Sequence, residues 1–210
     1  GLFRLYQSQA AMKKVLDMFD ESFQKAGTAG DDVKPEVRES AQERSRVMLS
    51  VLRAEPKLVA GLLPEALVDL KTEKSRKIDT WMFLAALAAR TKQLKEAEIL
   101  FRQCLITPSP EHEHKVYSGL LDLLHQQHKN KEIVALCKDA LDGRLSARNT
   151  NVVLFEANLA AALADLGKFE EALPHADQAI KLSSENLKVE ARCRKAGILA
   201  RAEKYDDALR

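Results

Sequence analysis

The amino-acid sequence predicts an all-α protein built from stacked antiparallel helix pairs. Three observations lead to this prediction: a helix-forming composition, apolar residues at helical spacing, and a short turn motif that returns at a nearly fixed interval. The 210 residues include 29 Ala and 31 Leu, but only 8 Gly and 6 Pro. Ala and Leu favour helices strongly, whereas Gly and Pro interrupt them.

Residues 1–77 are predicted to form N-terminal helices. Apolar residues on one face predict an amphipathic helix over residues 3–26. A second helix is expected to start at Pro35, because Pro suits the first helical turn. A third is expected over residues 57–74, where Pro64 should kink or split it. One interpretation takes residues 35–74 as a degenerate repeat, which would make the first helix a cap or a docking segment.

A turn motif repeats from residue 78 onward. Each copy has a break, one apolar residue, two charged residues and a final small residue. Full copies occupy residues 91–97, 166–172 and 202–208, and residues 130–133 are a weaker copy. The copies end at Ala97, Ile133, Ala172 and Ala208, spaced by 36, 39 and 36 positions. A fixed period of this size is typical of stacked helix pairs.

Each repeat is predicted to be two helices joined by a tight turn. In the first, residues 78–90 and 94–106 form the helices, and Pro108 ends the second one. A small residue at the end of the turn motif lets the two helix axes approach to about 8–10 Å, so Ile133 predicts a wider crossing. The three additional residues of the longest spacing fit the polar loop 142–150.

The repeat boundaries that follow are residues 78–112, 114–150, 153–187 and 189–210, the last repeat being cut short. Because the last repeat is half-formed and the sequence begins with Gly1, we expect a fragment of a longer protein. The apolar face left by the half-formed repeat could also support an oligomer.

The repeats resemble the tetratricopeptide repeat family, whose motif reads W-x-x-L-G-x-x-Y, then A-x-x-x-F, then P. The first repeat matches through Trp81-x-x-Leu84-Ala85 and Ala97-x-x-x-Phe101. The third departs from the pattern at Glu156, and the fourth has Lys195 where a leucine is expected. The resemblance covers residues 78–210. It implies a right-handed superhelix whose first helices line a concave groove that binds a peptide or a partner helix.

Helix phase, applied to this resemblance, gives the residues expected to face the groove. They are Asp79, Met82, Lys115, Ser118, Asp122, Leu154, Asn158, Glu190 and Arg194, together with the small residues Ala86, Ala157, Ala161, Cys193 and Gly197. Asn158 could hydrogen-bond a peptide backbone and Arg194 could pair with an acid. The alternative is that both make ordinary contacts between helices.

One subtype of the family grips a C-terminal carboxylate, and only Asn158 and Arg194 match its clamp. Glu190 stands where that subtype needs a lysine, and an unpaired acid repels a carboxylate. We therefore expect no carboxylate clamp.

Composition and motifs exclude other classes. The 33 basic and 31 acidic residues nearly cancel, so no nucleic-acid partner is expected. No apolar run is long enough to span a membrane, so no membrane insertion is expected. Cys104, Cys137 and Cys193 are too sparse for a disulfide framework or a zinc site, and we expect three buried thiols in a cytoplasmic protein.

No catalytic motif is present: there is no phosphate-binding glycine loop, no G-x-S-x-G and no H-E-x-x-H. His112 and His114 are expected in a flexible polar loop, His125 and His128 at a hydrated helix end, and His175 in solvent. No metal or cofactor is expected. The sequence thus favours a non-catalytic scaffold that binds a protein or peptide. The alternative is a recruiting or regulatory domain of a larger enzyme whose catalytic domain lies elsewhere.

Overall fold

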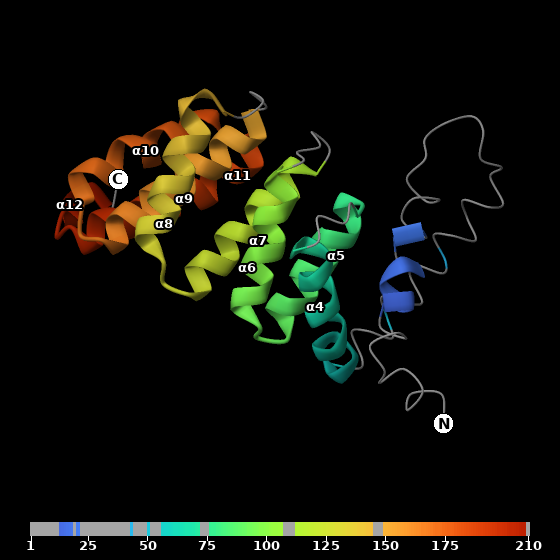
Figure 1. Cartoon of the computed structure of the whole chain (residues 1–210). Coiled ribbons are helices and arrows are strands. Elements are labelled where there is room, and N and C mark those ends of the chain that lie inside the picture. Colours follow the sequence, from blue (N-terminus) through green and yellow to red (C-terminus); the bar gives the residue numbers. More distant parts are fainter. Residues whose placement is uncertain are drawn as a thin grey trace, which may run out of the picture. The chain divides into compact units, whose positions relative to one another are not determined.

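The computed structural model describes residues 13–18, 20–21, 43, 50, 56–71, 76–106, 112–144 and 149–208. Within these ranges every regular element is helical, which confirms the predicted all-α class (Figure 1). The chain divides into two compact units, Gly1–His112 and Glu113–Arg210.

Three helices dominate the first unit: α4 (Pro56–Lys71), α5 (Ile78–Arg90) and α6 (Leu94–Ile106). The bounds of α5 and α6 agree with the prediction at both ends. The expected split at Pro64 is wrong, because α4 runs through it as one helix. Pro64 has no backbone N–H, so α4 lacks one of its backbone hydrogen bonds. Its neighbours Leu62 and Leu63 are almost completely buried, and their packing holds the helix together.

The start of α5 is tied to the described part of the N-terminal helix, residues 13–18 and 20–21, which is helical as expected. Oδ1 of Asp20 accepts hydrogen bonds from the backbone N of Lys77, at 2.7 Å, and from Oγ1 of Thr80, at 2.9 Å. This carboxylate therefore satisfies donors at the first turn of α5. The buried Arg76 side chain pairs with Asp69 and Asp17.

The rest of the helix predicted over residues 3–26 and most of the helix predicted from Pro35 lie outside the described residues. The proposal of a degenerate repeat over residues 35–74 therefore stays a prediction.

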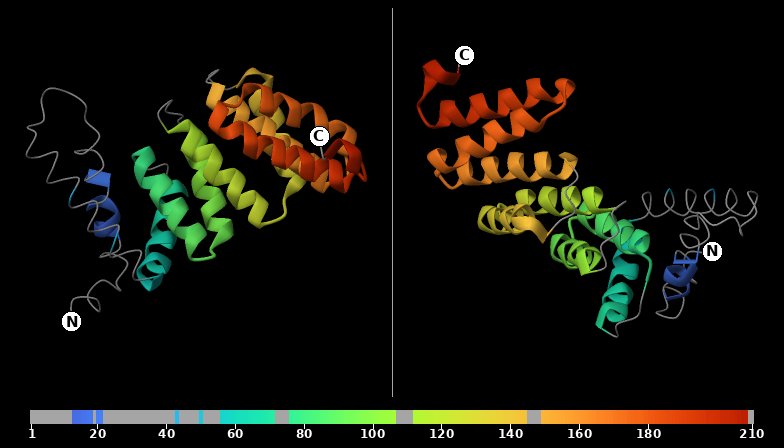
Figure 2. Two further views of the ribbon diagram at one scale, coloured as in Figure 1. Left: turned by 180° about the vertical axis from the view of Figure 1, so that it is seen from behind. Right: turned by 90° about the horizontal axis from the view of Figure 1, so that it is seen from above.

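The second unit contains α7 (Glu113–Gln126), α8 (Asn130–Asp139), a π-helical turn (Ala140–Arg144), α9 (Asn149–Asp165), α10 (Phe169–Leu182), α11 (Glu185–Arg201) and α12 (Tyr205–Ala208). Figure 2 shows α9, α10 and α11 stacked side by side in alternating directions. The loop expected at residues 142–150 is shorter than predicted. A π-helical turn uses its first residues, and α9 begins at Asn149.

Four tight turns join α5 to α6, α7 to α8, α9 to α10 and α11 to α12, and they share one backbone conformation. Each has a residue with positive φ: Lys92 (63°), His128 (54°), Gly167 (75°) and Glu203 (61°). The following residue donates its N–H to the carbonyl five positions earlier, as Lys168 does to Leu163 at 2.9 Å. This is the Schellman motif, which ends a helix with a left-handed residue. The positive-φ positions are spaced by 36, 39 and 36 residues, the period predicted from the turn motif.

The residue that ends each turn motif lies in the seam between helices. Ala97, Ile133 and Ala172 are 0% exposed, and Ala208 is half-buried. The α5–α6 and α9–α10 pairs, which have Ala at this position, pack extensively. The α7–α8 pair, which has Ile133, packs less, and α8 packs more closely on α9. This difference agrees with a wider crossing at the larger side chain.

Candidate functional site

The second unit is hollowed where α7, α9 and α11 face one another. Two adjoining hollows, of about 190 and 440 Å³, share Ala157, Asn158, Ala179, Ala191 and Arg194 in their linings. We call these two hollows the α9–α11 groove. The predicted residues Asp122, Leu154, Asn158, Glu190 and Arg194 all line it.

Small side chains make the floor of the groove. The larger hollow is lined by six alanines and a glycine: Ala157, Ala160, Ala161, Ala176, Ala179, Ala191 and Gly197. A methyl group built on Gly197 meets no atom within 4 Å. The groove is therefore open at this point, and a peptide backbone could approach the helices closely.

Asn158 forms hydrogen bonds within the unit. Its Nδ2 donates to the carbonyl of Leu154 at 2.8 Å, and its Oδ1 lies 2.8 Å from Nε2 of His125 on α7. Asn158 therefore makes a contact between helices, which was the alternative to ligand binding expected from the sequence. A side-chain amide carries two donor hydrogens, and the bond to Leu154 uses one. The second hydrogen remains for a ligand in the groove.

Arg194 lies at the rim, where its Nη2 is 2.7 Å from Oε1 of Glu190. The two side chains are 57% and 59% exposed. Exposed pairs of this kind contribute roughly 0–1 kcal/mol, so exchanging Glu190 for another acid costs little. Glu190 is the acid that was expected to disfavour a carboxylate clamp, and the structure places it beside Arg194.

Of the other predicted groove residues, Ala157, Ala161 and Gly197 line the two hollows and the rest do not. Lys115 is exposed and Ser118 half-buried on α7, and neither lines the two hollows. In the first unit, Met82 is half-buried on α5, and Oδ1 of Asp79 lies 2.9 Å from Nε2 of His112. Ala86 is exposed on α5. Cys193 lines a different hollow and is exposed, so its expected burial is wrong.

Several groove residues were not predicted from the sequence, among them His125 and Arg201. His125 was expected at a hydrated helix end, but it is half-buried against Asn158. Arg201 also lines the groove. Its Nη1 is 2.8 Å from Asp165, its Nη2 donates to the Ala164 carbonyl at 2.9 Å, and its guanidinium lies 5.9 Å from the Phe169 ring centre. One sequence signal could have found the contact between His125 and Asn158. The two residues are separated by 33 positions, which is close to one repeat.

Two other histidine expectations are also corrected, whereas His128 is exposed just after the end of α7, as expected. Nδ1 of His175 lies 2.6 Å from Oε2 of Glu156, whose side chain is only 12% exposed, so His175 is not simply solvated. His112 bonds Asp79 instead of lying in a flexible loop. His128 adopts the left-handed conformation of a tight turn. Each of these positions has a role in the repeat architecture that its sequence neighbours do not reveal.

The buried thiols are chemically quiet. Burial raises the pKa of Cys137 to about 12, and the nearby charge of Glu156 adds to the effect. Burial likewise raises the pKa of Cys104 to about 12; a hydrogen bond that the sulfur accepts from its own backbone N–H opposes this effect, and the charge of Asp79 adds to it. A thiol with such a pKa stays protonated near neutral pH and is a poor nucleophile. Among the described residues, no group of three or more His, Cys, Asp or Glu is arranged to hold a metal ion.

Comparison with known families agrees with this geometry. The family model described as tetratricopeptide repeat matches residues 157–188. This match supports a tetratricopeptide-repeat segment at these residues. The repeat contains most of the groove-lining part of α9, all of α10 and the start of α11. Asn158 lies on its first helix and Ala172 at its helix crossing. No curated protein matched the chain. Among the described helices, none is long and apolar enough to cross a membrane.

Proposed function

We propose that this protein is a non-catalytic interaction module that binds an extended peptide or a partner helix in the α9–α11 groove. Tetratricopeptide repeats are typically protein-interaction elements, and residues 157–188 match this family. The observation that carries the proposal is the floor of small residues between Asn158 and Arg194. It leaves room for a ligand backbone beside two polar side chains.

Three kinds of contact would hold the ligand. Apolar ligand atoms would cover the alanine floor, which contributes about 25 cal/mol for each Å² of apolar surface buried. The remaining amide hydrogen of Asn158 would donate to a ligand carbonyl. Arg194 would exchange its bond to Glu190 for one to an acidic group of the ligand. This charge-assisted hydrogen bond would have planar geometry.

We also propose a reducing compartment, in keeping with a cytoplasmic protein. The support is that Cys104, Cys137 and Cys193 are all free thiols. Disulfides are common in oxidising compartments and rare in the cytosol.

A cross-linking pull-down from the source cell tests the groove. The baits are the wild-type chain, the double variant Asn158→Ala/Arg194→Glu, and a control, Lys181→Glu, which changes an exposed residue outside the groove. All three must show the same helical circular-dichroism spectrum. We expect a partner captured by the wild type and the control and lost from the double variant. Equal capture by all three would contradict binding in the groove.

A further inference from the structure

The α9–α11 groove carries one charge that the described part of the chain does not balance. Its larger hollow is lined by Asp122 of α7 and by Arg194 and Arg201 of α11. Both arginines have acidic partners, because Arg194 pairs with Glu190 and Arg201 pairs with Asp165. Asp122 is exposed, and among the described residues it has no hydrogen bond or ion pair. The uncompensated charge of the groove is therefore a carboxylate on α7.

Asp122 stands at a register position that the next two layers fill with small residues. The tight turns after α7, α9 and α11 are spaced by 39 and 36 residues. The same spacing leads from Asp122 to Ala161 and then to Gly197, and both line the same hollow. Neither side chain is larger than a methyl group, so a ligand that lies on this row can reach the carboxylate. Lys115, the lysine of α7, lies about two turns earlier and lines neither hollow.

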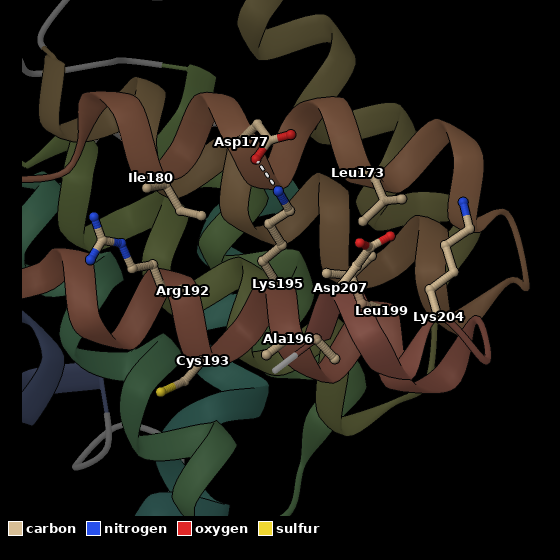
Figure 3. Close-up of a pocket in the computed structure, with 11 residues that line it drawn as sticks. Leu173, Asp177, Ile180, Arg192, Cys193, Lys195, Ala196, Leu199, Lys204 and Asp207 are labelled. Carbon is tan, nitrogen blue, oxygen red and sulfur yellow. Dashed lines mark hydrogen bonds and ion pairs between the residues drawn. The ribbon is translucent and has the colours of Figure 1, made fainter. Parts of the chain in front are cut away.

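The acids of a neighbouring hollow differ from Asp122 because they are paired. This hollow lies between α10, α11 and α12, and its lining includes Asp177 and Asp207 (Figure 3). Asp177 pairs with Lys195 at 2.6 Å, the interaction drawn as a dashed line in Figure 3. Asp207 is also engaged. A ligand cation would have to displace a partner from Asp177, whereas Asp122 has none to displace within the described part of the chain.

A cationic ligand group gains more from the α9–α11 groove than an anionic one. An acid that approaches Arg194 has to replace Glu190, so one exposed ion pair is exchanged for another of similar strength. A base that approaches Asp122 adds an ion pair that the unbound groove lacks. A guanidinium group suits this place well, because it can bond both oxygens of a carboxylate. The charge preference of the groove therefore comes from Asp122.

Asn158 favours an extended ligand over a helical one. Its Nδ2 uses one hydrogen for the Leu154 carbonyl, and the second hydrogen needs an acceptor. The backbone carbonyls of a helix already accept hydrogen bonds from N–H groups four residues later, except in the last turn. An extended peptide has unpaired carbonyls along its whole length. It can therefore supply the acceptor at any point where it crosses α9.

We propose that the α9–α11 groove selects an extended basic peptide. One arginine or lysine side chain of this peptide pairs with Asp122, and a backbone carbonyl accepts the second amide hydrogen of Asn158 above the alanine floor. This inference rests on the proposed function, and it adds the charge and the backbone conformation of the ligand. It makes Asp122, rather than Arg194, the residue that sets the charge preference.

Selection from a phage-displayed library of random heptapeptides tests the proposal. An isolated helix needs about 12–15 residues to be stable in water, so heptapeptides present extended backbone. The baits are the wild-type chain and a Gly197→Leu chain, in which the leucine side chain fills the groove. Peptides that bind the wild type and are lost from the Gly197→Leu chain are the groove peptides. We expect them to be enriched in Arg or Lys at one position.

A charge reversal then assigns this preference to one residue. The Asp122→Lys chain should select Asp or Glu at the same peptide position. The matched control is Asp139→Lys, which reverses an exposed acid of α8 outside both hollows and should select the same basic peptides as the wild type. All baits must show the same helical circular-dichroism spectrum.

Affinities of one synthetic groove peptide complete the test. By fluorescence anisotropy, Asp122→Asn should weaken binding of the basic peptide by about fivefold, the effect of losing one exposed ion pair. It should not change the binding of the same peptide with glutamine in place of the basic residue. Groove peptides without a basic preference, or with the same preference in the Asp122→Lys chain, would overturn this inference and leave groove binding intact. If the Gly197→Leu chain lost no peptide, groove binding itself would be contradicted, and this inference with it.

Discussion

The ammonium nitrogen of Lys195 on α11 lies 2.6 Å from Oδ1 of Asp177 on α10. Lys195 stands one period after Leu159, which is completely buried on α9. Asp177 stands 39 residues after Lys138, an exposed residue of α8. Both positions thus depart from the preceding layer, and the two departures form one ion pair. The lysine that breaks the family pattern is half-buried and paired, so it is compatible with the fold.

Substitutions at Lys195 and at Leu159, which stand one period apart, should change the free energy of unfolding by very different amounts. Lys195→Leu removes a partly exposed ion pair and restores apolar packing, so we expect the free energy of unfolding to change by less than about 1 kcal/mol. Leu159→Lys places an unpaired charge in the core and should cost more than about 3 kcal/mol. Urea unfolding followed by circular dichroism measures both. A loss for Lys195→Leu as large as that for Leu159→Lys would show that the fold depends on the Lys195–Asp177 pair.

Of the four turn residues with positive φ, one is a glycine, Gly167. Gly167→Ala should destabilise the protein by about 1–2 kcal/mol, because an L-residue is strained at this φ. A methyl group there meets no atom within 4 Å, so steric contact adds nothing. The matched control is Gly197→Ala, within α11 and equally unhindered, which should stabilise by about 0.5–1 kcal/mol. Thermal melts check the signs, and the same sign for both variants would refute the turn conformation.

Ala172 is fully buried at the crossing of α9 and α10. Ala172→Leu should overpack this crossing and lower the free energy of unfolding by about 1–3 kcal/mol. Ala135→Leu makes the same change at an exposed position of α8 and should shift stability by no more than about 0.5 kcal/mol. Chemical denaturation of the two variants compares them directly. An unchanged midpoint for Ala172→Leu would place the helix crossing elsewhere.

Thiol reactivity should separate the three cysteines. In the native protein at pH 8, a thiol-specific reagent should modify Cys193 alone, since Cys104 and Cys137 are buried. All three should react in denaturant. A count of more than one reactive thiol in the native protein would contradict the burial of α6 and α8.

The same thiols make stability depend on pH. Their pKa values lie near 12 in the folded protein, against an ordinary value of 9.0. Between these values the folded state holds protons that the unfolded chain has lost, so stability falls as pH rises from about 9 toward 12. Replacing Cys104 and Cys137 by Ala should flatten this part of the pH profile. Urea midpoints from pH 8 to pH 10.5 measure the effect, and identical profiles would argue against it.

Much of the fold could be predicted because it depends on local signals. The turn motif gave both ends of α5 and α6, since each turn combines a left-handed residue with a residue that packs in the helix crossing. Helix continuity through Pro64 was mispredicted, because burial of the flanking leucines outweighed one lost hydrogen bond. The π-helical turn at Ala140–Arg144 had no local signal either.

The candidate site was predictable only in part. Helix phase found Leu154, Asn158 and Arg194, because residues on one face of consecutive first helices share a surface. It missed His125 and Arg201, whose roles come from partners on other helices. It also placed Cys193 in the groove, although Cys193 lines a different hollow between α10 and α11.

Site-specific photo-cross-linking tests groove binding most directly. A benzoylphenylalanine replaces Ala161, which lines the α9–α11 groove, or Ala135, an exposed residue of α8 outside it. We expect a cross-link to a defined partner peptide from position 161 alone, and its loss when Gly197→Leu fills the groove. Equal cross-linking from both positions, or retention in the Gly197→Leu chain with its melting temperature intact, would contradict the claim that this groove binds the partner.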